Sequence, residues 1–474
     1  MKEFSVIKNA KELLSHGSAD AREKVLDMAD RVLCELNSYK RLHEMLKRDG
    51  DILTIGSRKY DLSKFKRVYA FTSGKAGNHM ARAFESILAD DLTLGISIVK
   101  IKDENDVYKK TELYIGGHPL PNEEGIRGCQ RMIEIADQMG PDDLLLMGLS
   151  GGCSSLMGYP VEGITLQDLR EATDVMIKSS MWVMDINDVR GHLSRTGRGR
   201  LAQHIHGSKV VCFEIWDAVG LDGITDYTEP QPIMGTPVGY DTITFAGIDK
   251  ILQKYDLYDK LPRNVLEYLK RADPTEETPQ EQICDVDYYL VNTPPDLCST
   301  AEHVGKEMGI ETHILTSYAE GESRDYGTFM GSLSKEINNN NRPFAAPCFV
   351  ISAGETTTWI RDNSAIKGHG GPSQEMVAAF ALAADGLKDV CLLSIDSEGT
   401  DGTTIAAGGL ADGTSCQQAV AKGVHLKRSL LEHATYEALS SINDIVITGN
   451  TGTNLCDFNV LYIGAQEQLP EGCK

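Results

Sequence analysis

The sequence predicts an α/β protein of two domains, with helices on both faces of a parallel sheet. Three observations support this fold class. Short apolar runs that end in Gly, Ser or Asp alternate with amphipathic helical stretches, the pattern of right-handed parallel crossovers. The length of 474 residues exceeds one core, because domains average about 150 residues. The composition, 41% hydrophobic and 24% charged, is that of an ordinary globular protein.

The elements of the N-terminal half follow in order along the chain. Residues 21–37 place apolar side chains at helical spacing opposite a charged face, so we expect a helix. Residues 65–88 read as a strand, a Gly-rich turn and a helix, and residues 112–136 repeat this pattern. Further strands are expected within 142–149 and at 210–215. Such a sheet binds small ligands beyond the carboxyl ends of its strands.

A stretch rich in Pro, Gly and Thr at residues 221–242 predicts an irregular connection between the domains. Residues 244–272 then look helical, and 287–309 restart the strand–loop–helix pattern. Further units are expected at 347–359, 389–404 and 443–458. We therefore predict two domains, residues 1–240 and residues 241–474.

Charge and composition exclude several function classes. A formal net charge of −22 opposes binding to nucleic acid, whose phosphates would be repelled. The eleven cysteines form no CxxC pair and no zinc-type cluster, so we expect reduced thiols in a cytoplasmic protein. The first residues lack the apolar core of a signal peptide, and no apolar run is long enough for a membrane span.

Polar residues follow the predicted strands in seven places. Gly and Ser are ordinary turn residues, so each place alone is a weak signal. If the strands are parallel and their ends face one cleft, the loops together supply main-chain N–H groups, hydroxyls, one lysine and several carboxylates, which suit phosphate and a bound cation. Neither a P-loop nor a G-x-G-x-x-G fingerprint is present. The seven places are 72–75, 116–119, 150–152, 217–222, 352–357, 396–402 and 448–454.

A series of ordered motifs makes the chain resemble the glycerate 2-kinase family, whose C-terminal domain is called MOFRL. The motifs span nearly the whole chain. They are SGKAGNHMA (73–81), GGHPLPNEEG (116–125), LSGGCSSL (149–156), INDVRGHLSRTGRGRLA (186–202), WDAVGLD (216–222), EGESR (320–324), SAGETTT (352–358), GHGGPSQE (368–375), EGTDGTTIAAGG (398–409) and TGNTGTNLCD (448–457).

The resemblance implies a Rossmann-like N-terminal domain, a second α/β domain of MOFRL type and an active site in the cleft between them. It implies a cytoplasmic kinase that uses ATP and Mg²⁺ and phosphorylates the 2-hydroxyl of D-glycerate to give 2-phosphoglycerate. The partners are then a nucleotide and a small sugar acid, with no nucleic acid and no membrane. A homodimeric state is left open.

Three residues are expected to be catalytic. Lys75 follows a strand and opens a helix, where the helix dipole disfavours a cation unless an anion lies nearby. Its expected role is to neutralise the transferring phosphoryl group or to hold the substrate carboxylate. Asp217 is expected to orient the hydroxyl as a base or to bind the metal, with Asp222 as a second metal ligand. Arg190 is expected to bind a carboxylate or phosphate, as the choice among four clustered arginines.

The nucleotide and substrate are expected to contact residues from both halves of the chain. The glycines of the LSGGCSSL motif let the backbone approach an anion, and its hydroxyls supply donors. In the second domain, Asp401 is the favoured metal or phosphate contact. The expected cofactor-binding residues are Ser150, Gly151, Gly152, Ser154, Ser155, Glu355, Gln374, Thr400, Asp401, Thr404, Thr453 and Asn454.

Three alternatives stay open at this point. The chain departs from the family pattern near the acceptor, with Thr196 to Arg200 in place of Lys-Gly-Gly-Arg and Pro372-Ser373 in place of Arg-Asn. A related sugar acid is therefore an alternative acceptor. A nicotinamide-dependent hydroxypyruvate reductase is a second alternative, against which the missing fingerprint counts. A non-catalytic sensor of sugar acids is the third.

Overall fold

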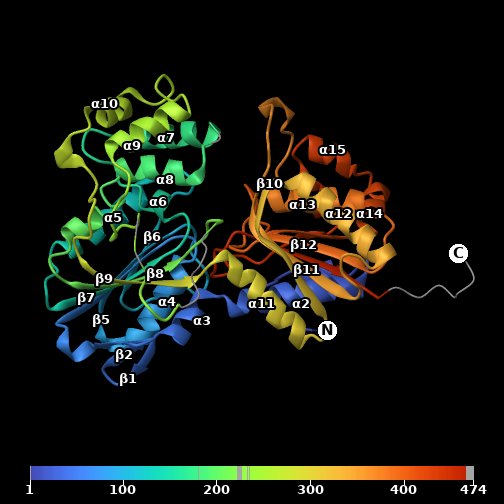
Figure 1. Ribbon diagram of the computed structural model, residues 1–474, viewed down its shortest axis with the longest axis horizontal. Helices are drawn as coiled ribbons and strands as arrows, with labels where there is room; N and C mark the ends of the chain where they lie inside the picture. Colours follow the sequence, from blue (N-terminus) through green and yellow to red (C-terminus); the bar gives the residue numbers. More distant parts are fainter. Residues whose placement is uncertain (1, 180, 221–226, 232, 234, 466–474) are drawn as a thin grey trace, which may run out of the picture. The chain divides into compact units, whose positions relative to one another are not determined.

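The protein is described by a computed structural model that covers residues 2–179, 181–220, 227–231, 233 and 235–465 (Figure 1). It divides into two compact units. The parallel-sheet unit comprises Ser38–Ile215 and Ile224–Val291. The mixed-sheet unit comprises Met1–Asn37, Trp216–Gly223 and Asn292–Lys474.

The parallel-sheet unit is built on six strands in the order β6-β5-β4-β7-β8-β9. Renumbered from the first strand of the sheet, this is the order 3-2-1-4-5-6 of the dinucleotide-binding Rossmann fold. The pairs β6–β5, β5–β4, β4–β7 and β7–β8 are all parallel, as the sequence predicts. The strands are β4 (Arg67–Ser73), β5 (Leu92–Val99), β6 (Thr111–Ile115), β7 (Asp143–Leu149), β8 (Lys209–Ile215) and β9 (Asp285–Asn292).

Burial explains the composition of the central strands. Every residue of β7, DLLLMGL, is buried, as expected for a strand that is covered on both faces. Strands β4 and β7 are neighbours in the middle of the sheet. After β4 the chain continues to β5, towards one edge of the sheet, whereas after β7 it continues to β8, towards the opposite edge. The turns after β4 and β7 therefore flank the point where the strand order reverses, and in open α/β sheets this crevice is where ligands bind.

Helices and a small second sheet complete the parallel-sheet unit. Helices α7 to α10 share one apolar cluster that includes Leu169, Val189 and Ile248. The small antiparallel sheet has the order β1-β2-β3. The elements are α3 (Ser38–Met45), α4 (Gly77–Leu88), α5 (Glu123–Ala136), α6 (Cys153–Leu156), α7 (Leu166–Lys178), α8 (Val183–His192), α9 (Phe245–Lys254), α10 (Arg263–Arg271), β1 (Lys47–Asp49), β2 (Ile52–Ile55), β3 (Arg58–Asp61), and short 3-10 turns at Leu62–Lys64, Ala89–Asp91, Leu201–His204 and Pro274–Glu276.

The mixed-sheet unit also has six strands, in the order β10-β11-β15-β12-β13-β14. Only β10 and β11 pair in parallel, whereas β15 is antiparallel to both of its neighbours. Parallel crossovers were expected throughout, but β12 is followed by the antiparallel strand β13 with no helix between them. The strands are β10 (Glu311–Glu322), β11 (Cys348–Thr357), β12 (Val390–Asp396), β13 (Gly408–Asp412), β14 (Ile445–Val446) and β15 (Asp457–Ile463).

Helices cover both faces of the mixed sheet. In Figure 1, α12 and α13 lie over one face, and α2 and α11 lie under the other, where they contact the strands. Arg22 of α2 is fully buried and bonds Asp412 and Asp444. The helices are α1 (Ala10–Leu13), α2 (Ala19–Glu35), α11 (Pro294–Glu307), α12 (Ser323–Asn340), α13 (Pro372–Ala383), α14 (Ser415–Ala421), α15 (Leu426–Leu431) and α16 (Thr435–Ser441), with a 3-10 turn at Asn363–Ala365.

The division into units differs from the predicted boundary near residue 240. Strand β9 lies next to β8, and α9 and α10 pack with α7 and α8, so residues beyond 240 belong to the parallel-sheet unit. Conversely, α2 packs against β12 and β15 near the other end of the chain. One polar stretch also differs from expectation. Residues 352–357 lie within β11 and not after it, whereas residues 448–454 follow β14 as expected.

Two expectations on cysteines and membranes can be compared with the described residues. The ten cysteines among them are all free thiols, and seven of these are buried. Within the same residues, every helix is too short or too polar to cross a bilayer.

Candidate active-site residues

In the parallel-sheet unit, the turns after β4 and β7 are hydrogen-bonded to each other. The main-chain N–H of Ser150 donates to the carbonyl of Ser73 at 3.0 Å, and that of Lys75 donates to the carbonyl of Gly151 at 3.0 Å. The N–H of Ala76 donates to Oγ of Ser150 at 3.0 Å. These bonds hold Lys75 and the predicted anion-binding turn side by side where the strand order reverses.

Gly74 is required by the close approach of the two turns. Its φ of +126° lies in a region that other residues rarely adopt. A Cβ atom at this position would also lie 2.1 Å from Oγ of Ser150 and 2.5 Å from its carbonyl oxygen. A side chain here would therefore push the turns apart.

The side chains of Lys75 and His118 both lie close to the Cβ position of Gly152. A Cβ atom on Gly152 would lie 3.0 Å from Cδ2 of His118 and 3.3 Å from Cγ of Lys75. Gly152 also has a φ of +83°, which other residues rarely adopt. Both the close contacts and the backbone conformation therefore favour glycine there. Lys75 is half-buried and precedes Ala76, the N-cap of α4. His118 thus lies beside Lys75 against residues 150–155, which we call the glycine turn.

Ser154 belongs to a closed hydrogen-bonded triangle with two residues of α8. Its hydroxyl donates to Oδ1 of Asn187 at 2.9 Å. Nη2 of Arg190 donates to Oγ of Ser154 at 2.9 Å and to Oδ1 of Asn187 at 2.6 Å. Asn187 was not among the predicted residues, although its position three residues before Arg190 places both on one helix face.

Arg190 is half-buried, and its guanidinium has no counter-ion among the described residues. No carboxylate there lies within salt-bridge distance of it, and its buried Nε has no hydrogen-bond acceptor. Burial lowers the pKa of Arg190 to about 10. An unpaired buried cation is costly, so this position favours an anionic ligand.

The other three arginines of the same segment have protein partners. Arg198 pairs with Asp188 and lies 3.7 Å from Asp241. Arg200 is buried and donates to main-chain carbonyls, and Arg195 donates to the carbonyl of Pro160. Of the four, Arg190 is the one with a buried N–H that has no acceptor among the described residues, so it is the best anion-binding candidate.

Two of the predicted donors in the glycine turn are used within the protein. Oγ of Ser155 donates to the carbonyls of Gly117 and Pro119, at 3.2 and 2.6 Å. Oγ of Ser150 accepts from Ala76, and both serines are about 1% exposed. Their geometry favours a role in holding the turns together over direct ligand contact.

In the mixed-sheet unit, Asp217 lies next to the segment that precedes β15. Nδ2 of Asn454 donates to Oδ2 of Asp217 at 2.7 Å, and the thiol of Cys456 donates to the carbonyl of Asp217 at 2.7 Å. Two residues predicted from distant motifs are thus brought into contact. Asp222, the second predicted metal ligand, lies outside the described residues.

Gln374, Asp401 and Thr404 form a second group in the same unit. The carboxylate of Asp401 accepts from the main-chain N–H groups of Ser373 and Gln374, at 3.2 and 2.9 Å. Nε2 of Gln374 donates to Asp401 at 2.9 Å and to Thr404 at 3.0 Å. Asp401 was the favoured metal or phosphate contact, but both of its oxygens bond the first turn of α13. This geometry instead favours a positioning role, because the carboxylate occupies the place of an anion at a helix N-terminus.

Asp457, the first residue of β15, is a buried carboxylate that sequence reasoning missed. It accepts from the N–H and Oγ1 of Thr356, at 3.1 and 2.9 Å, and from Oγ of Ser373 at 3.3 Å. Burial raises the pKa of Asp401 to about 6. Burial and the charge of Asp401 raise the pKa of Asp457 above its ordinary value. Its place at the end of the TGNTGTNLCD motif was the only signal in the sequence.

The remaining predicted residues of this unit have mixed environments. Glu355 is exposed on β11, and its charge contributes to the raised pKa of Asp401. Thr400 donates to Glu398. The Thr453 hydroxyl is buried and, among the described residues, has no acceptor or donor. The described residues of the whole chain contain no cluster of three or more His, Cys, Asp or Glu that could hold a metal ion.

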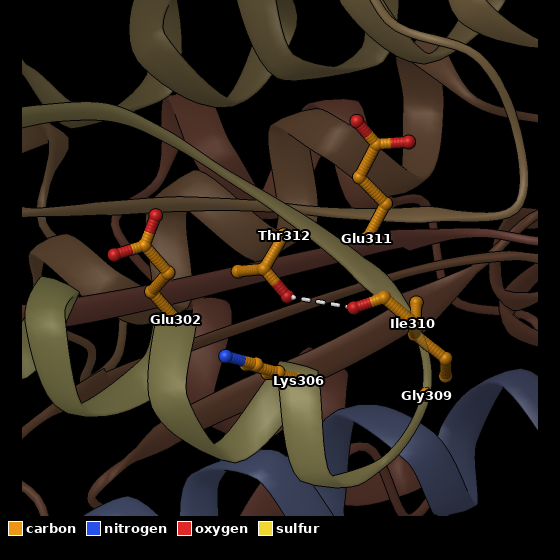
Figure 2. A pocket seen from close by; sticks show the side chains of 6 residues that line it. All are labelled: Glu302, Lys306, Gly309, Ile310, Glu311 and Thr312. Carbon is orange, nitrogen blue, oxygen red and sulfur yellow. Dashed lines mark hydrogen bonds between the residues drawn. The ribbon is translucent and has the colours of Figure 1, made fainter.

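A separate pocket lies at the turn between α11 and β10 (Figure 2). It measures about 300 Å³, and Glu302, Lys306 and Glu311 contribute its charged side chains. The hydroxyl of Thr312 donates to the carbonyl of Ile310 beside it. None of the predicted site residues lines this pocket, and two carboxylates to one ammonium do not favour an anionic substrate.

Comparison with known proteins now places the chain in a family. Residues 24–270 match the model described as a domain of unknown function (DUF4147), and residues 348–457 match the MOFRL family. A glycerate 2-kinase from Pyrococcus horikoshii is 32% identical over 438 residues, which cover 92% of this chain and 96% of that protein. The chain belongs to the glycerate 2-kinase family.

Other members share the fold as well as the sequence. The crystal structure of a glycerate kinase from Thermotoga maritima matches with a TM-score of 0.75 and 29% identity, covering 94% of this chain and all of that chain. A relative from Agrobacterium vitis, provisionally named a hydroxypyruvate reductase, is 29% identical over 84% of this chain and 100% of its own length. The resemblance read from the motifs, the two α/β units and the assignment to phosphotransferases are confirmed. Membership of a kinase family supports a nucleotide and a small-molecule acceptor as substrates.

Proposed function

We propose that this protein is a glycerate 2-kinase that transfers the γ-phosphoryl group of ATP to the 2-hydroxyl of D-glycerate. The observation that carries the proposal is Arg190. It is a half-buried arginine whose buried Nε has no acceptor and whose guanidinium has no counter-ion among the described residues, and it donates to Ser154. An acceptor with a carboxylate group would neutralise it.

The proposed reaction forms one bond and breaks one bond. The 2-hydroxyl oxygen bonds to the γ-phosphorus, while the bond between that phosphorus and the β–γ bridging oxygen breaks and ADP leaves. The hydroxyl proton passes to the carboxylate of Asp217. Lys75 holds the charge that develops on the transferring group, and Arg190 holds the carboxylate of the acceptor.

Mg²⁺ fits this proposal as an ion that arrives with the nucleotide. It binds through one or two carboxylates together with substrate phosphates, so a preformed cluster is not needed. Asp217 has a carboxylate with one oxygen bonded to Asn454, and it is the residue proposed to contact the ion. When bound, the ion supplies neutralisation of phosphate charge.

A panel of C3 to C6 sugar acids with ATP and Mg²⁺ tests the proposal. We expect ADP release with D-glycerate, and a product whose phosphate is coupled to the C2 proton in phosphorus–proton NMR. Lys75→Ala should lower the rate by about a hundredfold or more, since it removes charge stabilisation of the transition state. Lys75→Arg, which keeps the charge, should lose less.

Two results would contradict the proposal. Oxidation of a nicotinamide cofactor with hydroxypyruvate, and no ADP release with any acid, would support the reductase alternative. Tight binding of a sugar acid without turnover would support a sensor. Turnover of another acid in the panel, with D-glycerate inert, would replace the acceptor and keep the kinase.

A further inference from the structure

Arg190 retains most of its hydrogen-bonding capacity. A guanidinium has five N–H donors, and Arg190 uses those of Nη2 for Ser154 and Asn187. Among the described residues, Nε and Nη1 have no acceptor. Both partners of Nη2 are neutral, so the charge of Arg190 is held in place and not cancelled.

The orientation of the Asn187 amide follows from its neighbours. Arg190 can only donate hydrogen bonds, so the atom of Asn187 that faces it must be the carbonyl oxygen Oδ1. The same oxygen accepts from the hydroxyl of Ser154. One amide oxygen therefore fixes both the guanidinium and the serine of the glycine turn.

We propose that Asn187 is a specificity-determining residue that keeps Arg190 positioned but uncompensated, so that the enzyme selects acceptors with a carboxylate group. An aspartate at this position would accept the same two hydrogen bonds and would also neutralise the guanidinium. It would stabilise the free protein and compete with the substrate carboxylate. This inference rests on the proposed function, because it takes the ligand of Arg190 to be the acceptor.

Asn187→Asp is the decisive variant, because it replaces the side-chain NH2 group by one oxygen and cancels the charge of the guanidinium. We expect KM for D-glycerate to rise about tenfold or more, with kcat changed by less than about threefold, because substrate binding and not the chemical step is weakened. The thermal midpoint should rise, since a buried cation gains a counter-ion. A purely structural asparagine would give the opposite pattern, with a lower midpoint and a lower kcat.

Asn122→Asp is the matched control. Asn122 caps α5: its Oδ1 accepts from the N–H of Gly125 at 2.8 Å, and its Nδ2 donates to the carbonyl of Ile115 at 3.0 Å. Aspartate keeps the cap and loses the bond to Ile115. This variant should leave KM and kcat unchanged. Asn187→Ala, which removes the acceptor without adding charge, should raise KM and leave the midpoint unchanged or lower.

Calorimetric titration of D-glycerate, without nucleotide, separates this inference from the proposed function. Binding that is weaker in Asn187→Asp than in the wild type supports the inference whether or not turnover is seen. Equal binding by the two proteins, or no binding by the wild type, overturns it. Absence of ADP release by the wild type counts against the proposed function alone.

Discussion

Asn454 donates a hydrogen bond from Nδ2 to Oδ2 of Asp217 over 2.7 Å, although 237 residues separate them in the chain. Both belong to the mixed-sheet unit. The bond orients the carboxylate. It makes Asp217 an oriented carboxylate, which is what a base or metal ligand in phosphoryl transfer requires.

Asp217→Asn should lower kcat by about a hundredfold or more, because a general base or metal contact is lost. The amide can still accept from Asn454, so the far-ultraviolet circular dichroism spectrum should be unchanged. Asn454→Ala is the control, since it removes the orienting bond but keeps the carboxylate. It should cost about tenfold or less. Equal losses in the two variants would show that orientation, and not the carboxylate, limits the rate.

Gly152→Ala tests the contact between the glycine turn, Lys75 and His118. A methyl group would lie 3.0 Å from the His118 ring and 3.3 Å from Cγ of Lys75. We expect a loss of about 1–3 kcal/mol in the free energy of unfolding, from the positive φ together with the contact. Lys75 should move, so kcat should fall too.

Gly163→Ala separates backbone strain from contact. Gly163 has a φ of +84°, close to the +83° of Gly152, and nothing lies within 4 Å of its Cβ position. This variant should cost about 1 kcal/mol in the free energy of unfolding, measured by denaturant titration, and leave kcat unchanged. Should Gly152→Ala also keep full activity, the glycine turn would have no part in catalysis.

The buried pair Asp401 and Asp457 predicts that stability falls as pH rises from about 4 to 7. Burial raises the pKa of Asp401 to about 6, above the 3.8 of an ordinary Asp, and the pKa of Asp457 is raised as well. The folded state therefore binds more protons than the unfolded state in this window. The free energy of unfolding should decrease by about 3 kcal/mol for Asp401 alone, and level off above the folded pKa.

Asp457→Asn should flatten this dependence and raise stability at pH 7 to 8. The amide oxygen can accept from Thr356 and its nitrogen can donate to Ser373, so the hydrogen bonds are kept while the charge is lost. Denaturant titrations from pH 4 to 8 measure the effect. Asp385→Asn, on the surface, should follow the wild type. A wild-type curve that rises through this window would refute the assignment.

A fragment of residues 38–291 should fold alone, whereas residues 241–474 should not. The first contains all six strands of the parallel sheet and the helices of its apolar cluster. The second lacks α2, so it exposes part of one face of the mixed sheet and leaves Asp412 and Asp444 without Arg22. Cooperative thermal unfolding of the two purified fragments checks this. A folded 241–474 fragment would support the boundary that the sequence suggested.

The sequence predicts the parallel-sheet unit well, for a physical reason. Strands such as β7 are covered on both faces, so they appear as continuous apolar runs, and helices at 3.6-residue spacing separate them. The mixed sheet is harder to predict, because β12 and β13 are joined by the glycine-rich turn 397–407, which also resembles a loop before a helix. Helix α2 gives no local sign that its partners lie near the other end of the chain.

Candidate residues were predictable only where a motif marked them. The motifs mark Lys75, the glycine turn, Asp217 and Asn454. In the folded chain Lys75 lies at the glycine turn and Asp217 bonds Asn454. The motifs do not distinguish a residue that contacts ligand from one that holds the turn, so Ser150, Ser155 and Asp401 were grouped with the ligand contacts. Asn187 and Asp457 were missed, because their roles depend on partners that only the folded chain brings within hydrogen-bonding distance.

The three-segment path of the mixed-sheet unit has a consequence for synthesis on the ribosome. Arg22 emerges early, yet its buried partner Asp412 follows 390 residues later. At about 5–20 residues per second, the amphipathic face of α2 waits on the order of 20–80 s for the strands that cover it. During that interval the nascent chain exposes the apolar face of α2, which makes this helix a natural target for chaperones, and the whole parallel-sheet unit is synthesised before the strands that cover it.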